Sequence, residues 1–217
     1  MFRQFRRIEP GEVFAIGSDL AGGGGDYSVS QFYSITNFDV PLVYSSLKLG
    51  SEMISNLFPV LEKIADLTGY KPLIGIERQF GGLFEAERLA ALNRKGKFEV
   101  FKMPVYGEGV SEEGNKYGWD TNSATRPEML QSLKTAIDKR VIKVYDKQTI
   151  EECYSFIESK TSSGWKAQAE RNAHDDHVMS LAIALKISHF LRDVEELRLE
   201  PAGSGRQFEY ASRGRWR

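Results

Sequence analysis

The sequence has little cysteine, no long apolar run and almost no net charge. Cys153 is the only cysteine among 217 residues, which excludes an internal disulfide and a multi-cysteine zinc site and fits a reducing compartment. No run of about 18 apolar residues occurs, and the charged N-terminus MFRQFRRIEP is not followed by the apolar segment of a secretory signal. We therefore predict a cytoplasmic protein without a membrane segment, in which Cys153 is a partly buried helix residue.

The charge balance excludes a strong overall attraction to polyanions. Lys and Arg total 29 against 30 for Asp and Glu, which leaves a formal net charge of -1. A protein with this balance does not bind nucleic acid through its overall field. Any DNA binding must therefore depend on a local basic face or on a partner that delivers the DNA.

Apolar periodicity predicts three strands in succession, followed by alternating helices and strands. The second strand places Val29, Tyr33 and Ile35 on one face and Phe32 on the other. The predicted strands are 13–19, 27–36, 41–49, 72–77, 98–105 and 141–146. The predicted helices are 53–67, with Ser51 as its cap and Gly69 as its stop, 83–92 and 126–138, and further helices fill much of the remainder. This order predicts an α/β fold, in which an antiparallel meander and later strands form a mixed sheet flanked by helices.

Three segments are expected to lie outside regular structure. The four glycines of 22–25 form a loop or tight connection after the first strand. The polar stretch 106–125 is a loop long enough to be functional or mobile. The segment 199–217 has few aliphatic residues, so we predict one domain over 1–198 and a flexible C-terminal tail over 199–217.

Carboxylates occupy unusual positions at the ends of predicted elements. Asp19 and Glu77 each end an apolar strand, and Asp175 with Asp176 begins an apolar helix. Taken singly, an acid at a strand end meets water and an aspartate at a helix start is a cap. If the strands are neighbours, however, the carboxylates converge, and such a cluster is costly unless it binds divalent cations. The pattern as a whole predicts a metal site for phosphodiester hydrolysis.

The same residues lie in four ordered runs, which are GSDLAGGGGDYS, IGIERQFGG, YGWDTNSATRPEML and NAHDDHVMSLAIAL. This series resembles the motifs of phage large-terminase nuclease domains, in the ribonuclease H and retroviral-integrase fold group, over about residues 13–190. The resemblance implies that Asp19, Glu77, Asp175 and Asp176 are catalytic metal ligands. Which of the two adjacent aspartates binds metal directly stays open.

The resemblance also implies a reaction and a setting. Two Mg²⁺ or Mn²⁺ ions, bridged by Asp19, would support endonucleolytic hydrolysis of double-stranded DNA during genome packaging in an infected bacterial cell. The implied partners are a terminase ATPase domain, a small terminase and a portal protein. The sequence contains no phosphate-binding loop of the GxxxxGKS or GxxxxGKT type, so ATP-driven packaging is not assigned to this chain.

Other side chains near these motifs are weaker candidates. The candidates for DNA contact are Arg78, Lys116, Arg126, Lys166 and Arg171. Asp26 is expected in a solvent-facing turn or in the outer shell of the site. A surface or packing role is expected for His174 and His177, with tuning of a metal or water as the alternative, and a structural role for His189. Core or loop packing is expected for Trp119 and Trp165, with stacking on a base as the alternative.

Three alternatives remain open. A Holliday-junction resolvase or transposase of the same fold would use a similar acidic cluster, but resolvases commonly have strongly basic faces. An actin-like ATPase or sugar kinase also has an Asp and a glycine-rich loop after its first strand, but it needs a second such loop and a longer chain. An inactive DNA-binding module on the same fold is disfavoured by the intact acids Asp19 and Glu77.

Overall fold

The main sheet of the computed structural model is mixed and seven-stranded. The structure describes residues 1–22, 25–104, 116–161, 164–169, 174–191 and 197–199, and no side chain in 157–169. The strand order is β1-β4-β3-β2-β5-β6, and β9 pairs with the β4 strand as well. The strands are β1 Phe2–Gln4, β2 Phe14–Asp19, β3 Ser28–Ser34, β4 Asp39–Ser46, β5 Leu73–Ile76, β6 Glu99–Val100 and β9 Lys143–Val144.

The predicted meander is confirmed. Strands β2, β3 and β4 pair antiparallel, with Phe14 opposite Ser34 and Asp19 opposite Val29. Helix α1 (Gly50–Thr68) then connects β4 to β5, and β5 pairs parallel with β2. A parallel pairing needs such a crossover, so this helix places the ends of β2 and β5 at the same edge of the sheet.

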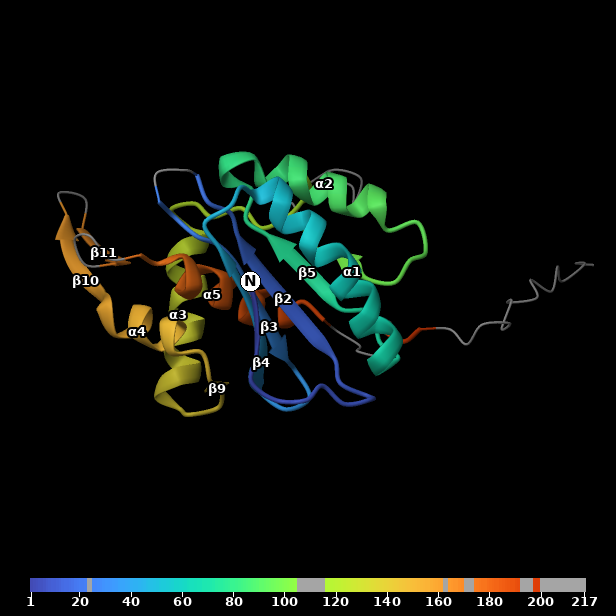
Figure 1. The fold of residues 1–217 in the computed structure, drawn as a ribbon. Helices are drawn as coiled ribbons and strands as arrows, with labels where there is room; N and C mark the ends of the chain where they lie inside the picture. The colour runs from blue at the N-terminus through green and yellow to red at the C-terminus, as the bar shows by residue number, and fades with distance from the viewer. Residues whose placement is uncertain (23–24, 105–115, 162–163, 170–173, 192–196, 200–217) are drawn as a thin grey trace, which may run out of the picture.

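Helices cover both faces of the sheet (Figure 1). Helices α1 and α2 (Gly82–Leu92) pack on one face with Phe14 and Ile16. The other face carries Ala15 and the helices α3 (Thr125–Asp138), α4 (Lys147–Ser155) and α5 (Asp176–Ser188). Because neither face meets water, every residue of β2 is buried, which explains its continuous apolar run.

Helix α5 lies directly against β2 at Gly17. A Cβ atom at Gly17 would lie 2.0 Å from the carbonyl oxygen of Ser180 and 2.3 Å from the backbone nitrogen of Ala184. Any larger residue would therefore push α5 away from the sheet. The close approach matters for function because α5 carries the adjacent aspartates at its first turn.

Several local predictions are confirmed. Val29 and Tyr33 belong to the core beneath α5, and Phe32 belongs to the core beneath α1. The backbone N–H of Gly69 donates to Ala65 at the end of α1, and Cys153 is partly buried in α4.

The predicted helix cap at Ser51 is wrong. Helix α1 begins at Gly50 after the cap position Leu49, and no side chain caps it. Ser51 lies inside the helix, where its carbonyl oxygen accepts hydrogen bonds from Ser55 and Arg88. The serine therefore contributes only its backbone.

The predicted strand 98–105 is wrong in extent, because its residues pair with two partners. Strand β6 pairs with β5, whereas β7 (Lys102–Met103) pairs with β8 (Lys116–Tyr117) in a separate two-stranded sheet. The predicted strand 141–146 shrinks to β9, and β1 has no counterpart among the predicted strands. Strands this short carry too few residues for a periodic signal.

Among the described residues after 146, the expected helices are α4 and α5. Between them, β10 (Phe156–Thr161) and β11 (Gly164–Ala169) pair antiparallel. Their sequences are mostly polar or small, FIESKT and GWKAQA, so apolar periodicity does not reveal them. Half of the predicted loop 106–125 and nearly all of the predicted tail 199–217 lie outside the described residues, and the domain boundary at residue 198 stays a prediction.

No helix among the described residues is both long and apolar enough to cross a membrane.

Candidate metal centre

Asp19 and Glu77 meet at the shared end of β2 and β5. Ser18 pairs with Ile76 in the parallel register, and the backbone N–H of Glu77 donates to the carbonyl oxygen of Ser18 over 2.8 Å. The next side chain on each strand is the carboxylate, and these two residues are only 7% and 6% exposed. The predicted convergence of the two acids is therefore present in the fold.

The backbone around Glu77 is held closely on both sides. The N–H of Trp119 donates to the carbonyl oxygen of Ile76 over 2.7 Å, which extends the sheet past the end of β5. After Glu77 the chain turns sharply into α2, and a Cβ atom at Gly82 would lie 1.6 Å from the carbonyl oxygen of Glu77. A glycine at position 82 thus lets the helix begin immediately beside the acid.

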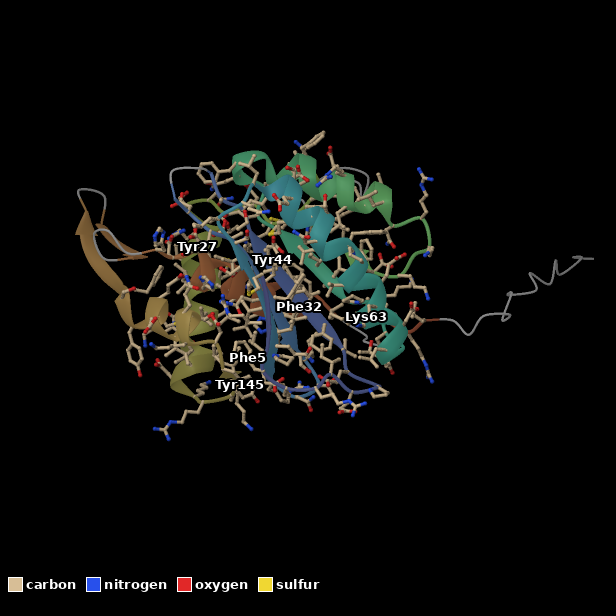
Figure 2. The ribbon with its side chains drawn as sticks, viewed as in Figure 1. Phe5, Tyr27, Phe32, Tyr44, Lys63 and Tyr145 are labelled. Atoms are coloured by element: carbon tan, nitrogen blue, oxygen red, sulfur yellow. The ribbon has the colours of Figure 1, made fainter. Side chains whose placement is uncertain are left out.

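The adjacent aspartates at the start of α5 have different partners. Asp175 occupies the N-cap position but makes no side-chain capping bond; its Oδ2 accepts from Nη2 of Arg126 over 3.0 Å. Oδ2 of Asp176 accepts from the backbone N–H of Tyr27 over 2.9 Å. Figure 2 labels Tyr27 at the end of the sheet that faces the start of α5. Neither aspartate therefore serves as a side-chain cap of α5.

All of these acids line one cavity. Asp19, Glu77, Asp175 and Asp176 border a space of about 200 Å³. The other lining residues are Leu20, Gly22, Asp26, Gln79, Phe80, Arg126, His174 and Met179. The four predicted ligands are thus brought together by two strand ends and one helix start.

The electrostatics of the cavity disfavour charge on Asp19 and Asp176. Burial, and after it the neighbouring carboxyls of Glu77, Asp176 and Asp175, raises the pKa of Asp19 well above its ordinary value. Burial raises the pKa of Asp176 to about 6, with further contributions from Glu152, Asp26 and Asp175, although the Tyr27 N–H opposes the shift.

A divalent cation would remove this repulsion. Among the described residues, no Lys, Arg or His forms an ion pair with Asp19 or Glu77. Hard cations such as Mg²⁺ take carboxylate oxygens as ligands. A bound cation favours the charged form of each carboxylate and so lowers the pKa that burial and neighbouring acids raise. The donor set of this cavity therefore fits divalent metal ions.

A buried polar network that includes a residue of α4 fixes the first turn of α5. Glu152 of α4 accepts from the backbone N–H of His177 over 2.7 Å, and it lies 2.6 Å from Nδ1 of the same residue. Nη2 of Arg3 lies 3.3 Å from the other ring nitrogen, and Arg3 also pairs with Asp146. Because arginine only donates, Nε2 of His177 accepts and Nδ1 donates to Glu152. The sequence favoured a surface or packing role for His177, and it gave no indication of Glu152, which stands in an ordinary helical pattern.

The predicted DNA-contact residues have different environments. Arg126 lines the cavity. The guanidinium of Arg78 donates to the backbone carbonyls of Tyr117 and Lys116, and burial lowers its pKa. Lys116 itself is exposed on β8. The side chain of Lys166 and the whole of Arg171 lie outside the described residues.

The tryptophans and histidines named in the sequence analysis also lie in different environments. Trp119 is buried in the core beneath α5, as expected, and His189 lies at the far end of that helix. The side chain of Trp165 is outside the described part of the chain. Asp26 and His174 are both exposed, as expected for a turn and for a surface histidine, and both line the cavity.

Phe80 is a further cavity residue that sequence reasoning missed. It is 69% exposed at the cavity wall, with φ 51° and ψ 37°. A bulky residue rarely adopts this left-handed conformation, and such residues cluster at functional sites. The only sequence signal was its place in the RQFGG run after Glu77.

Together, the sheet order and the position of its acids define the protein as an α/β protein of the ribonuclease H-like type, as predicted. An antiparallel meander is followed by a parallel strand, and two neighbouring strand ends carry acids. The start of α5, which packs on the sheet, adds two further acids to the same cavity.

Solved structures of terminase nuclease domains share this fold over most of the chain. The large terminase nuclease of the thermophilic phage G20c is 22% identical, with a TM-score of 0.62 over 85% of both chains. The nuclease domain of the Thermus phage P74-26 large terminase is 21% identical, with a TM-score of 0.58 over 84% of this chain and 81% of that one. The human cytomegalovirus terminase nuclease domain is 11% identical, with a TM-score of 0.52 over 84% of each.

Other structures of the G20c domain contain bound magnesium, cobalt or zinc. No protein-family model matches the present sequence, and no curated protein matches it. At these identities the structural likeness establishes the fold, and the chemistry of the site must be argued from its residues.

Proposed function

We propose that this chain is the nuclease domain of a viral large terminase, a metal-dependent endonuclease that hydrolyses phosphodiester bonds of double-stranded DNA. One observation carries the proposal: Asp19, Glu77, Asp175 and Asp176 line one cavity at the shared end of β2 and β5. Buried acids that repel one another are costly as scaffold. Bound divalent cations would offset this repulsion, so metal binding explains why the acids are clustered.

The proposed cofactors are two Mg²⁺ or Mn²⁺ ions. Asp19 lies beside Glu77, and its carboxyl interacts with those of Glu77, Asp176 and Asp175, so Asp19 would be the ligand shared by the two ions. Glu77 and Asp176 would complete the two ligand sets. When bound, such ions would supply activation of a water and stabilisation of the departing 3′ oxygen.

The protein's own residues hold this arrangement in place. The β2–β5 register fixes Asp19 beside Glu77, and the Tyr27 N–H and Glu152 fix the first turn of α5. Rigid elements of this kind supply the positional accuracy that catalysis requires.

Arg126 is the best-placed residue for contact with a DNA phosphate. It lines the cavity, and its side chain remains 24% exposed beside Asp175. Arginine binds phosphate without reading sequence. Arg78 and Lys116 would contribute only at the edge, since the Arg78 guanidinium is already bonded to backbone carbonyls.

The proposed biological role is the cutting of concatemeric viral DNA during genome packaging in an infected bacterial cell. The support is the terminase resemblance of the sequence and the fold shared with terminase nuclease domains. The ATPase domain, small terminase and portal protein are the proposed partners, and residues 1–198 are the proposed folded domain. The net charge of -1 suits a domain whose DNA is delivered by such partners.

A resolvase or transposase of the same fold is the alternative within this class of site. The low net charge and the GWDTNSATRP run favour the terminase. The carboxylate cavity also favours an active enzyme over an inactive DNA-binding module, and no feature of the cavity favours an actin-like ATPase.

Plasmid cleavage tests the proposal. The full chain is incubated with supercoiled DNA in Mg²⁺, Mn²⁺, Ca²⁺ or EDTA, beside Asp19→Asn and the control Asp138→Asn. Asp138 is an exposed acid at the end of α3 that pairs with Lys134. We expect nicking and linearisation in Mg²⁺ or Mn²⁺ that is lost in EDTA and in Asp19→Asn but retained in Asp138→Asn.

Two results would contradict the proposal. Cleavage that survives in Asp19→Asn would show that the cavity does not cut DNA. An absence of cleavage under every condition, together with an absence of divalent-metal binding, would remove the enzyme assignment altogether.

A further inference from the structure

We propose that Asp26, His174 and Asp176 form a mixed nitrogen and oxygen subsite within the metal centre, which selects a transition ion such as Zn²⁺ or Co²⁺ over Mg²⁺. The inference rests on the proposed nuclease function and deepens it, because the subsite lies in the same cavity. It adds two ligands, Asp26 and the His174 imidazole, to the carboxylates that the sequence pattern identified.

The three side chains already have the spacing of metal ligands. Nδ1 of His174 lies 3.7 Å from Oδ1 of Asp26 and 3.8 Å from Oδ2 of Asp176, and the ligand atoms of all three residues lie within 4.8 Å of one another. Bonds from zinc to nitrogen and oxygen are about 2.0–2.2 Å, so two ligands on one ion lie at most about 4 Å apart. Only small side-chain adjustments are needed to close this set around an ion.

One backbone contact brings the set together. The N–H of Tyr27 donates to Asp176, which fastens the segment after the glycine-rich loop to the start of α5. Asp26 directly precedes Tyr27, and the ring of Tyr27 packs edge-on against His174 at a centroid distance of 5.7 Å. The same contact thus places residues from two distant parts of the sequence on one side of the cavity.

The ligand atoms of this set are available. The His174 side chain is 44% exposed and that of Asp26 is 52% exposed. In the described part of the chain, neither Asp26 nor Asp176 forms an ion pair with a lysine or an arginine. His177, in contrast to His174, is not available as a metal ligand, since it is fully buried and both of its ring nitrogens have partners.

A second ligand set in the cavity has a different chemistry. Asp19 and Glu77 are more than nine-tenths buried and interact with each other rather than with a cation. Oxygen ligands alone suit Mg²⁺, whereas an imidazole ligand favours ions such as Zn²⁺ and Co²⁺. The cavity therefore contains one carboxylate-only subsite and one that includes a nitrogen.

The test follows the imidazole signals of the full chain during metal titration. Protein labelled with ¹⁵N at histidine is titrated with ZnCl₂ or MgCl₂, and the ring nitrogens of His174, His177 and His189 are observed by NMR. We expect Zn²⁺ to shift Nδ1 of His174 and to leave His177 and His189 in place, whereas Mg²⁺ shifts none of them. Zn²⁺ affinity, measured by calorimetry, should fall at least tenfold in His174→Gln and in Asp26→Asn and stay unchanged in His189→Gln.

The outcomes separate this inference from the proposed function. Zn²⁺ binding without a His174 shift, or with equal affinity in His174→Gln, would overturn the mixed subsite and leave the Asp19 and Glu77 site standing. If neither ion binds the wild-type protein, both proposals fail. The side chains of His174 and Asp26 are 44% and 52% exposed, so circular dichroism should show an unchanged fold in their variants.

Discussion

Arg126 of α3 holds Asp175, the residue immediately before α5, through a hydrogen bond of 3.0 Å. The neighbouring Asp176 instead accepts a hydrogen bond from the backbone N–H of Tyr27. One aspartate of the pair therefore has an arginine partner, and no lysine or arginine among the described residues pairs with the other. This difference assigns the two adjacent acids separate roles.

Asp176→Asn is expected to weaken metal binding far more than Asp175→Asn. Asp175 already has a cationic partner, whereas Asp176 has a backbone donor and acidic neighbours. We predict that Mn²⁺ affinity falls at least tenfold in Asp176→Asn and less than about threefold in Asp175→Asn, corresponding to about 1.4 kcal/mol for each factor of ten. Calorimetric titration measures both constants, and equal losses in the two variants would contradict the assignment.

Arg126→Ala is expected to reduce the salt dependence of DNA binding. If Arg126 binds one phosphate, its loss lowers the slope of log K against log salt by about 0.9. Lys134→Ala is the matched control, because Lys134 lies on the exposed face of the same helix and pairs with Asp138. Fluorescence anisotropy with a DNA duplex at several salt concentrations, in Ca²⁺ to prevent cutting, provides the slopes. An unchanged slope in Arg126→Ala would remove the phosphate contact.

Glu152→Ala is expected to destabilise the fold and loosen the first turn of α5. The substitution leaves the backbone N–H and the imidazole of His177 without their acceptor in a fully buried position. Unsatisfied buried groups cost about 1–3 kcal/mol each, so the free energy of unfolding should fall by roughly 2–4 kcal/mol. Glu151→Ala removes an exposed neighbour that pairs with Lys147, and it should change stability by less than about 0.5 kcal/mol. Urea denaturation distinguishes the two, and similar midpoints would contradict the role of Glu152.

The stability of the metal-free protein should depend on Asp176 in a pH-dependent way. Burial raises the pKa of Asp176 to about 6, above the value of about 4 in the unfolded chain. Its contribution to stability is therefore complete below about pH 4 and is lost as the pH rises through about 6. In EDTA, Asp176→Asn should stabilise the protein by about 1–3 kcal/mol at pH 7.5 and have little effect at pH 4. Scanning calorimetry at both pH values measures this, and a gain of equal size at each would contradict it.

The sheet and the acidic cluster were predictable because both depend on patterns within single elements. The continuous apolar run of β2, the spacing of apolar residues in α1 and the acid at each strand end are all visible in the sequence. The α1 crossover then brings Asp19 beside Glu77, since it allows β5 to pair parallel with β2.

The missed features depend on contacts between elements. Glu152 supports His177 from a different helix, and Asp26 meets His174 only because Tyr27 bonds to Asp176. A local sequence pattern does not indicate contacts between residues so far apart in the chain. The β10–β11 pairing was missed because its strands are short and contain few large apolar residues.

The most direct test of the metal centre is a crystal structure of the protein in MnCl₂, with anomalous diffraction used to locate the ions. We predict two anomalous peaks about 4 Å apart inside the cavity, one of them in contact with both Asp19 and Glu77. The peak at Glu77 should disappear in crystals of Asp19→Asn. Peaks that lie only outside this cavity, or an empty cavity in saturating Mn²⁺, would contradict the account.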